Sequence, residues 1–205
     1  MQASTVLLVN DLQNDFCHHE GIFYKQGLSS AALQSILPQV IDTILFCSKI
    51  KIPIIATQVT ILNNLKGEAI GLKHLKKLHP FLEKEGLREG TWGHDLLEDI
   101  PIINFKIRKW GVLTFFQTEL DHYLSSLNCK ELVLIGFTTN GSVETTAREA
   151  FGRGYKITTL SDCVASYSNS LHQSSLINLM NIGKVLSTKE WQGLYEKIVQ
   201  KETVK

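Results

Sequence analysis

Side chains suited to acid–base and nucleophilic chemistry follow three of the apolar runs in this sequence. Asp11 comes just after the run 5–9, Lys109 just after the run 102–107, and Ser142 shortly after the run 131–137. An acid, a cation and a hydroxyl that meet in one place form a plausible acyl-transfer site. Each residue also has a purely structural interpretation: a turn at the end of a strand for Asp11, a solvated basic cluster for Lys109 and a helix N-cap for Ser142.

The segment around Ser142 is the most informative of the three. A turn containing Gly136 and Gly141 leads into residues with a helical pattern, so the hydroxyl would face the unpaired N–H groups of a helix N-terminus. Such groups stabilise an anion or an oxyanion. Two known motifs fail here. A P-loop needs a lysine after Gly141, and a nucleophile elbow needs glycines where Asn140 and Glu144 stand.

The elements that must position these residues alternate between apolar strands and amphipathic helices. This pattern predicts a three-layer α/β fold around a doubly wound, parallel sheet, which carries its sites at the carboxyl ends of its strands. We predict six strands, over residues 5–9, 53–59, 102–107, 131–137, 155–160 and 184–186. We predict helices over residues 29–48, 115–127, 142–153, 170–180 and 188–200.

Length and composition bound the rest. With 205 residues, the chain is expected to form one domain over 1–205, in which the irregular segment 63–95 is a lid or interface insertion. The net charge of +1 gives no electrostatic reason to expect nucleic acid or an anionic membrane as partner. The four cysteines form no CxxC pair, and no signal peptide is evident, so we expect free thiols and a cytoplasmic location.

Three segments together resemble the isochorismatase-like cysteine hydrolase superfamily. They are VLLVNDLQNDF at 6–16, KWGVLTFFQTEL at 109–120 and GFTTNGSVETTAREA at 136–150, the last continued by RGYKITTLSDCVAS at 153–166. A fragment of the insertion, FLEKEGLREGTWGHDL at 81–96, also resembles the branch of ureidoacrylate amidohydrolases. The resemblance covers most of the chain, with the segments in the right order and spacing. It implies a Rossmann-like sheet with strand order 3-2-1-4-5-6 and a homo-oligomer, a dimer or a tetramer.

The resemblance also implies roles for particular residues. Asp11 takes the place of the catalytic acid/base, Lys109 that of the catalytic lysine and Ser142 that of the nucleophile. A cis peptide is expected between Phe137 and Thr138, and the backbone N–H groups of Thr138 and Ser142 are expected to form the oxyanion hole.

The reaction that these roles imply is hydrolysis of a C–N bond through a covalent acyl-enzyme. The expected partner is a small amide, ureido or carbamoyl compound, and no cofactor is expected. Phe16 and Trp110 are the candidate walls of the substrate pocket. For Phe16, packing in the core is an equally good interpretation.

The sequence departs from the family at the nucleophile, where Ser142 replaces a cysteine. Moving a proton from a thiol of pKa about 8.5 to an aspartate of pKa about 3.9 is uphill by about six kcal/mol before the site tunes either group. A hydroxyl is less acidic still, and serine nucleophiles usually rely on a histidine. His18 and His19 follow the first predicted strand, but no triad motif places them, so we predict impaired activity for this chain.

A second departure concerns metal. Nicotinamidase-type members of the family carry an Asp-x-His ligand group after the second strand, whereas this chain has Gln58, Val59 and Thr60 there. We therefore predict no zinc or other transition-metal site, which makes pyridine amides less suitable as substrates.

Two other functions stay open. One is isochorismatase-type hydrolysis of a vinyl ether, with Asp11 as general acid, and the other is a non-catalytic binding role. In all three interpretations none of the cysteines occupies the nucleophile position. Cys17 and Cys163 follow strand ends and are expected near the site, whereas Cys47 and Cys129 are expected to be structural.

Overall fold

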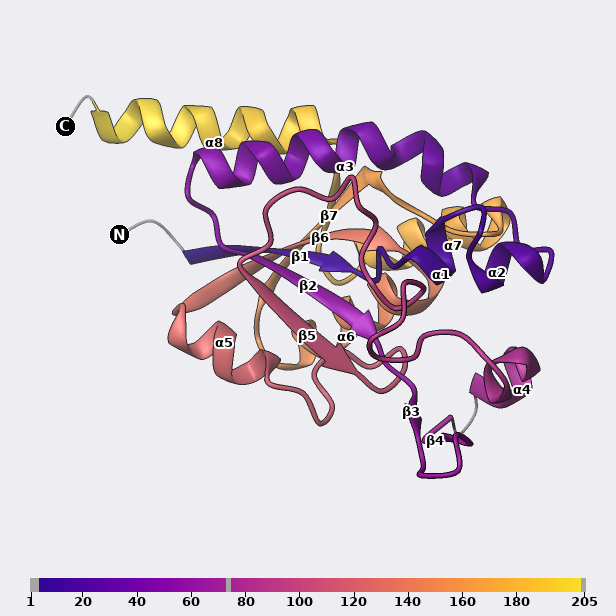
Figure 1. The fold of residues 1–205 in the computed structure, drawn as a ribbon. Coiled ribbons are helices and arrows are strands. Elements are labelled where there is room, and N and C mark those ends of the chain that lie inside the picture. The colour runs from indigo at the N-terminus through magenta and orange to yellow at the C-terminus, as the bar shows by residue number, and fades with distance from the viewer. Residues whose placement is uncertain (1–3, 73–74, 204–205) are drawn as a thin grey trace.

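A six-stranded parallel sheet forms the centre of the computed structural model, which describes residues 4–72 and 75–203 (Figure 1). The strand order is β5-β2-β1-β6-β7-β8, and every neighbouring pair is parallel. Numbered along the chain, these strands stand in the order 3-2-1-4-5-6, so the predicted fold class is confirmed. The strands are β1 (Ser4–Asn10), β2 (Ile54–Val59), β5 (Phe105–Lys109), β6 (Cys129–Phe137), β7 (Lys156–Ala165) and β8 (Lys184–Leu186).

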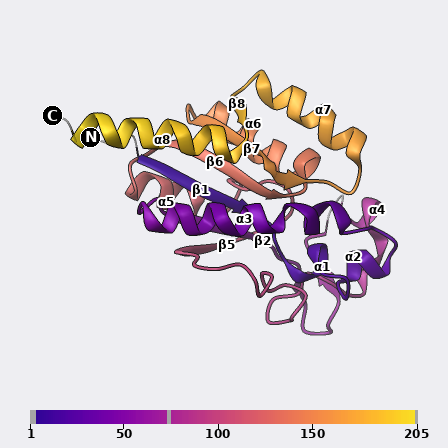
Figure 2. The ribbon, with the colours of Figure 1, turned by 90° about the horizontal axis from the view of Figure 1, so that it is seen from above.

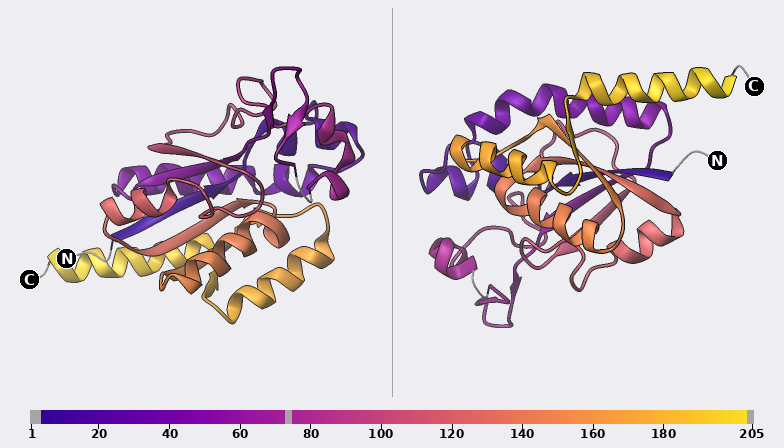
Figure 3. Two further views of the ribbon diagram at one scale, coloured as in Figure 1. Left: turned by 90° about the horizontal axis from the view of Figure 1, so that it is seen from below. Right: turned by 180° about the vertical axis from the view of Figure 1, so that it is seen from behind.

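Helices cover both faces of the sheet (Figures 1 and 2). One face carries α3 (Ala31–Lys49) and α8 (Thr188–Thr203), and the other carries α5 (Leu120–Ser126), α6 (Glu144–Gly152) and α7 (Asn169–Met180). Figure 3 shows the second layer from behind. Alternate residues of β1 serve the two layers, because Leu7 and Val9 join the core under α3 while Val6 and Leu8 join the core under α5 and α6.

The helix α3 is the one described helix that is long and apolar enough to cross a membrane by length and composition. In this fold its inner side is buried against the sheet through Leu33, Val40, Ile44 and Cys47. The helix therefore acts as a core helix here, and Pro38 is accommodated inside it.

The insertion 63–95 lies beyond the carboxyl ends of β1 and β2 (Figure 1). Its described part contains a small antiparallel ribbon and two short helices, preceded along the chain by two more helical turns after β1. The bounds are β3 (Leu62–Asn63), β4 (Ala69–Ile70), α4 (Leu75–Leu78), η1 (Pro80–Glu83), α1 (Asn14–Cys17) and α2 (Ile22–Lys25).

Several predicted bounds were wrong. The strand predicted over 102–107 begins at Phe105, since Ile102 is 54% exposed, and it continues to Lys109. The helix predicted over 115–127 begins only at Leu120, after Gln117 with a positive φ of 56°. The strand predicted over 155–160 continues to Ala165.

Candidate active site

Three strand ends bring the predicted chemical residues together. Asp11 follows β1 directly with a positive φ of 50°, and Lys109 is the last residue of β5. Ser142 lies in a π-helical turn, η2 (Thr139–Val143), that joins β6 to α6. The helix predicted from Ser142 therefore begins at Glu144, and Ser142 is not an N-cap of α6.

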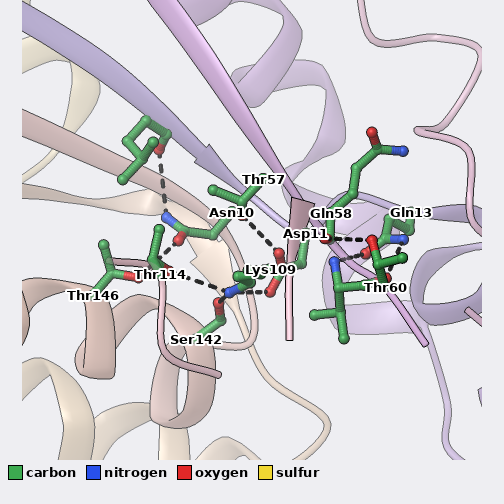
Figure 4. A network of polar contacts seen from close by, with 12 residues as sticks. Asn10, Asp11, Gln13, Thr57, Gln58, Thr60, Lys109, Thr114, Ser142 and Thr146 are labelled. Carbon is green, nitrogen blue, oxygen red and sulfur yellow. Dashed lines mark hydrogen bonds and ion pairs between the residues drawn. The ribbon is translucent and has the colours of Figure 1, made fainter. Parts of the chain in front are cut away.

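Lys109 is the centre of this group (Figure 4). Its ammonium nitrogen lies 2.8 Å from Asp11 Oδ2, and it donates to Ser142 Oγ and, over 3.3 Å, to Thr114 Oγ1. Lys109 is fully buried, and these three acceptors account for all three ammonium protons. The other carboxylate oxygen of Asp11 accepts a 2.6 Å hydrogen bond from Thr57 in β2. The buried ion pair is thus paired and hydrogen-bonded, as a buried charge requires.

Buried hydroxyls continue this network away from the cavity. Thr114 and Thr146 share a 2.6 Å hydrogen bond, and Thr146 donates to Asn10 Oδ1 over 3.1 Å. Asn10 Nδ2 donates in turn to the Ile135 carbonyl, which leaves its amide oxygen as an acceptor. Because that oxygen only accepts, Thr146 donates to it, Thr114 donates to Thr146, and the Thr114 oxygen accepts from Lys109. These donor and acceptor assignments make Lys109 the donor in its hydrogen bond to Thr114.

The turn that carries Ser142 is closely packed. The peptide bond between Phe137 and Thr138 is cis, at the position that the family resemblance implied. Gly136 has a φ of 113°, and a Cβ there would lie 2.7 Å from the Asn10 nitrogen. Glycine therefore permits the close approach of β6 and β1 beside the site.

A cavity of about 450 Å³ opens above this group. Asp11 and Ser142 lie on its wall together with Phe16, Phe137 and Thr138, so five of the predicted residues face one space. The insertion 63–95 contributes Leu75, Leu78, His79, Leu82 and Leu87 to the wall, and we refer to this insertion as the lid.

The expectation that Trp110 lines this cavity was wrong. Its indole is 36% exposed, borders a separate hollow beside Leu62 and Ile70, and donates through Nε1 to the Gln117 carbonyl. The positive φ of 146° at Gly111 turns the chain, so that Gly111 and Val112 reach the cavity instead.

Three further polar residues of the first predicted strand end are structural. Gln13 bonds through its amide to both backbone groups of Val59 and to the His94 carbonyl. Asn14 donates to the Trp92 carbonyl, and Asp15 accepts from the Leu87 and Ile22 N–H groups. The motif that follows β1 thus places one carboxylate, that of Asp11, at the cavity, and three further side chains that hydrogen-bond to the backbone of the insertion 63–95.

Sequence reasoning missed several residues of the site. Thr57, Thr114 and Thr146 are uncharged and lie on separate elements, so no spacing links them to Lys109. Ser166 and Tyr167 also line the cavity. They were missed because this strand was predicted to end at residue 160, whereas β7 ends at Ala165. The sequence signal at that end, Asp162, accepts from the Thr188 N–H at the start of α8.

The residues after β2, where the family resemblance implied an Asp-x-His ligand group for nicotinamidases, are hydrogen-bonded within the protein. Gln58 donates to the His94 carbonyl, and Thr60 shares a 2.8 Å hydrogen bond with His94 Nε2. Within the described ranges, one group of three metal-capable residues is close together: His18, His19 and Glu20. It lies among loop residues after α1, and His18 Nδ1 already accepts from the Glu20 N–H.

All four cysteines are buried and free. Burial raises the pKa of each thiol, well above its usual value for Cys17, to about 12 for Cys47 and to about 11 for Cys129 and Cys163. Cys17 lies beside the site, with its sulfur 3.8 Å from the Asp11 carbonyl oxygen. Cys163 was expected near the site but instead contacts Thr43 and Thr188, under α3 and α8.

A family model and several relatives assign this chain to the same protein family. The model of the isochorismatase domain matches residues 5–190. Nicotinamidase 3 of Arabidopsis thaliana is 28% identical over 179 residues, which cover 84% of this chain and 79% of that protein. Another Arabidopsis thaliana protein, named a probable inactive nicotinamidase, is 27% identical over 92% of this chain and 94% of its own length. The ureidoacrylate amidohydrolase of Acinetobacter baylyi is 30% identical over 61% of this chain, and the match covers 52% of that protein.

Solved structures agree with this result. An isochorismatase-like hydrolase from Alkaliphilus metalliredigens superposes with a TM-score of 0.74 at 25% identity, covering 94% of this chain and 98% of that one. A cysteine hydrolase from Pseudomonas syringae has the same fold, with a TM-score of 0.78 at 22% identity over 92% of this chain and 90% of that one.

Proposed function

This chain belongs to the isochorismatase family, and from that premise we propose that its site is built to hydrolyse a C–N bond of a small amide, ureido or carbamoyl compound. One observation carries the proposal: Asp11, Lys109 and Ser142 meet through hydrogen bonds and an ion pair beside one cavity. An acid/base, a cation and a nucleophile position within reach of one another are what acyl transfer requires.

The reaction has two halves. A nucleophile at position 142 gives its proton to Asp11 and attacks the carbonyl carbon, and the N–H groups of Thr138 and Ser142 stabilise the resulting oxyanion. The C–N bond then breaks, and the leaving nitrogen takes the proton from Asp11. Asp11 then takes a proton from water, and the hydroxide attacks the acyl carbon. The bond to the nucleophile breaks, the nucleophile takes that proton from Asp11, and the acyl group leaves as a carboxylic or carbamic acid.

With Ser142 as nucleophile, we propose that the chain is impaired in this reaction. Lys109 donates to Ser142 and to two other acceptors, so the ammonium has no lone pair with which to take the hydroxyl proton. Among the histidines of the described ranges, none is hydrogen-bonded to Ser142: His94 bonds to Thr60, and His172 bonds to Thr139. A serine here therefore lacks the base on which serine nucleophiles rely.

The Ser142→Cys variant tests the proposal. We expect it to release ammonia or amine from members of a panel of small amides and ureas, at least tenfold faster than the chain with Ser142. Ser142→Ala is the matched control, and adding Asp11→Asn to the Ser142→Cys variant is expected to abolish release. A folded Ser142→Cys variant that hydrolyses no member of the panel contradicts the proposal.

A second candidate function is non-catalytic binding. Ser142 favours it, because the site is suited to a thiol nucleophile and a serine stands in its place. One relative of similar length carries the word inactive in its name. This candidate predicts no turnover by either the Ser142 chain or its Ser142→Cys variant, but retained binding of a small ligand in the cavity.

A further inference from the structure

The walls of the cavity above Asp11 are mostly apolar. Phe23 lines the cavity together with Phe16 and Tyr167, and its ring centroid lies 4.5 Å and 6.1 Å from theirs. Leu82 and Leu87 are buried lid residues that complete the interior. A volume of about 450 Å³ lies in the range of sites that enclose most of a small organic molecule.

The mouth of the cavity is apolar as well. Leu78, Val112 and Leu171 line it and are 71%, 44% and 50% exposed. These three side chains come from three separate segments: the lid, the loop after β5 and α7. A ligand that enters between them removes apolar surface from water, which favours an apolar ligand.

Charge is scarce on the same walls. Of the cavity-lining residues within the described ranges, Asp11 is the one carboxylate or ammonium group. Burial lowers the pKa of His79 from its ordinary value of 6.5, which favours the neutral form of its ring. The Tyr167 hydroxyl donates to the Phe16 carbonyl, and the Ser166 hydroxyl donates to Asn140.

Among the described residues that line the cavity, a ligand carboxylate would therefore find no cation to pair with and would approach Asp11. Lys109 is fully buried behind Asp11, and its three protons are already donated. Burial of an unpaired charge is strongly unfavourable, whereas burial of an apolar group is favourable.

We infer that the substrate of this site is a neutral amide or ureide whose non-reacting part is an aryl or branched alkyl group, and that carboxylate-bearing compounds are excluded. The inference rests on the proposed function and adds the substrate class. Ureidoacrylate, the compound in the name of one relative, carries such a carboxylate and falls outside this class.

Calorimetric titration of the unaltered chain tests the inference without requiring turnover. The probes are 3-phenylpropanamide and the same amide with a carboxylate at the para position of its ring. We expect the neutral probe to bind at least tenfold more tightly than its carboxylate partner. Equal or tighter binding of the carboxylate probe, or no binding of the neutral probe, overturns the inference.

Val112→Lys provides the matched variant, because it adds a cation at the exposed mouth. We expect it to shift the ratio of the two affinities at least fivefold towards the carboxylate probe, and to lose that shift at high salt. Val112→Gln, which is polar and uncharged, is expected to leave the ratio within twofold. A Val112→Lys variant with an unchanged ratio contradicts a charge-based exclusion.

The outcomes separate this inference from the proposed function. If the neutral probe binds as expected but the Ser142→Cys variant hydrolyses nothing, the proposed function fails and the inferred ligand class stands. If the Ser142→Cys variant prefers carboxylate-bearing amides over neutral apolar ones, the proposed function stands and this inference fails.

Discussion

The carboxylate of Asp15 occupies the space that a side chain at Gly93 would need. A Cβ built on Gly93 would overlap both carboxylate oxygens. The Asp15 N–H also donates to the Gly93 carbonyl over 2.8 Å, and its Oδ2 accepts from the Leu87 N–H over 2.6 Å. The lid is therefore held against the segment after β1 through a contact that only glycine permits.

Gly93→Ala is expected to loosen this attachment. Displacing Asp15 costs about 1–3 kcal/mol, the usual penalty for overpacking a closely packed site. Urea unfolding measures the change. Gly152→Ala is the control, because a Cβ there meets nothing within 4 Å and its φ is not positive. A Gly93→Ala variant as stable as Gly152→Ala would show that the lid is not held by this contact.

Thr146→Val is expected to interrupt the relay behind Lys109. It keeps the shape of the side chain but leaves the buried Asn10 oxygen without its donor and Thr114 without its acceptor. A buried polar group without a partner costs about 1–3 kcal/mol, measurable by urea unfolding.

The same substitution distinguishes positioning of Lys109 from structural support alone. In the Ser142→Cys background, Thr146→Val is expected to lower kcat more than it changes KM and to shift the pH profile, because the Thr114 hydroxyl that accepts from Lys109 is no longer held by Thr146. Thr146→Ser keeps the hydroxyl and is expected to restore both. Equal loss of stability with unchanged kinetics would limit the relay to a structural role.

Stability is expected to fall as the solution is acidified below pH 6.5. Burial lowers the pKa of His79, His94 and His172 from the ordinary value of 6.5. Below 6.5 the unfolded chain therefore binds more protons than the folded one, so the free energy of unfolding decreases until the pH passes the folded pKa values.

Urea unfolding at pH 7.5 and pH 5.5 measures this dependence. His94→Gln removes one of the three groups and is expected to reduce the difference between the two pH values. His122→Gln, at an exposed position, is the control and is expected to leave the difference unchanged. A larger stability at pH 5.5 than at pH 7.5 would have the wrong sign.

Phe16 and Trp110 are expected to differ in their effect on ligand binding. Phe16→Ala removes a wall of the cavity and is expected to weaken binding of 3-phenylpropanamide about tenfold, which corresponds to about 1.4 kcal/mol. Trp110→Ala alters a side chain outside the cavity and is expected to leave this affinity within twofold. Calorimetric titration measures both, and the reverse ranking would contradict the assignment of the walls.

The strand order and the meeting of Asp11, Lys109 and Ser142 could be predicted, because apolar strands and the residues after them are local features of the sequence. The family resemblance supplied the order. Once parallel strands are ordered, their carboxyl ends share one edge of the sheet, and the residues that follow them lie close together.

Two of the remaining errors come from long-range packing, and the error at Trp110 comes from a local turn. Ser161 and Asp162 suggested a strand end, but β7 continues past them because Asp162 binds the start of α8, which lies far along the chain. Trp110 was predicted to line the cavity, but the chain turns at Gly111 and the indole hydrogen-bonds to the Gln117 carbonyl outside it. The threonine relay could not be predicted, because its residues are far apart in the sequence and have no characteristic spacing.

Because every native cysteine is buried, the folded chain is expected to react little with thiol-directed reagents. Each native thiol is shielded, and its pKa is raised by burial. Iodoacetamide added to the folded Ser142→Cys variant would therefore alkylate one position, visible as a single mass adduct per chain. The pH dependence of that labelling rate reports how far Asp11 and Lys109 favour a thiolate, before any substrate has been identified.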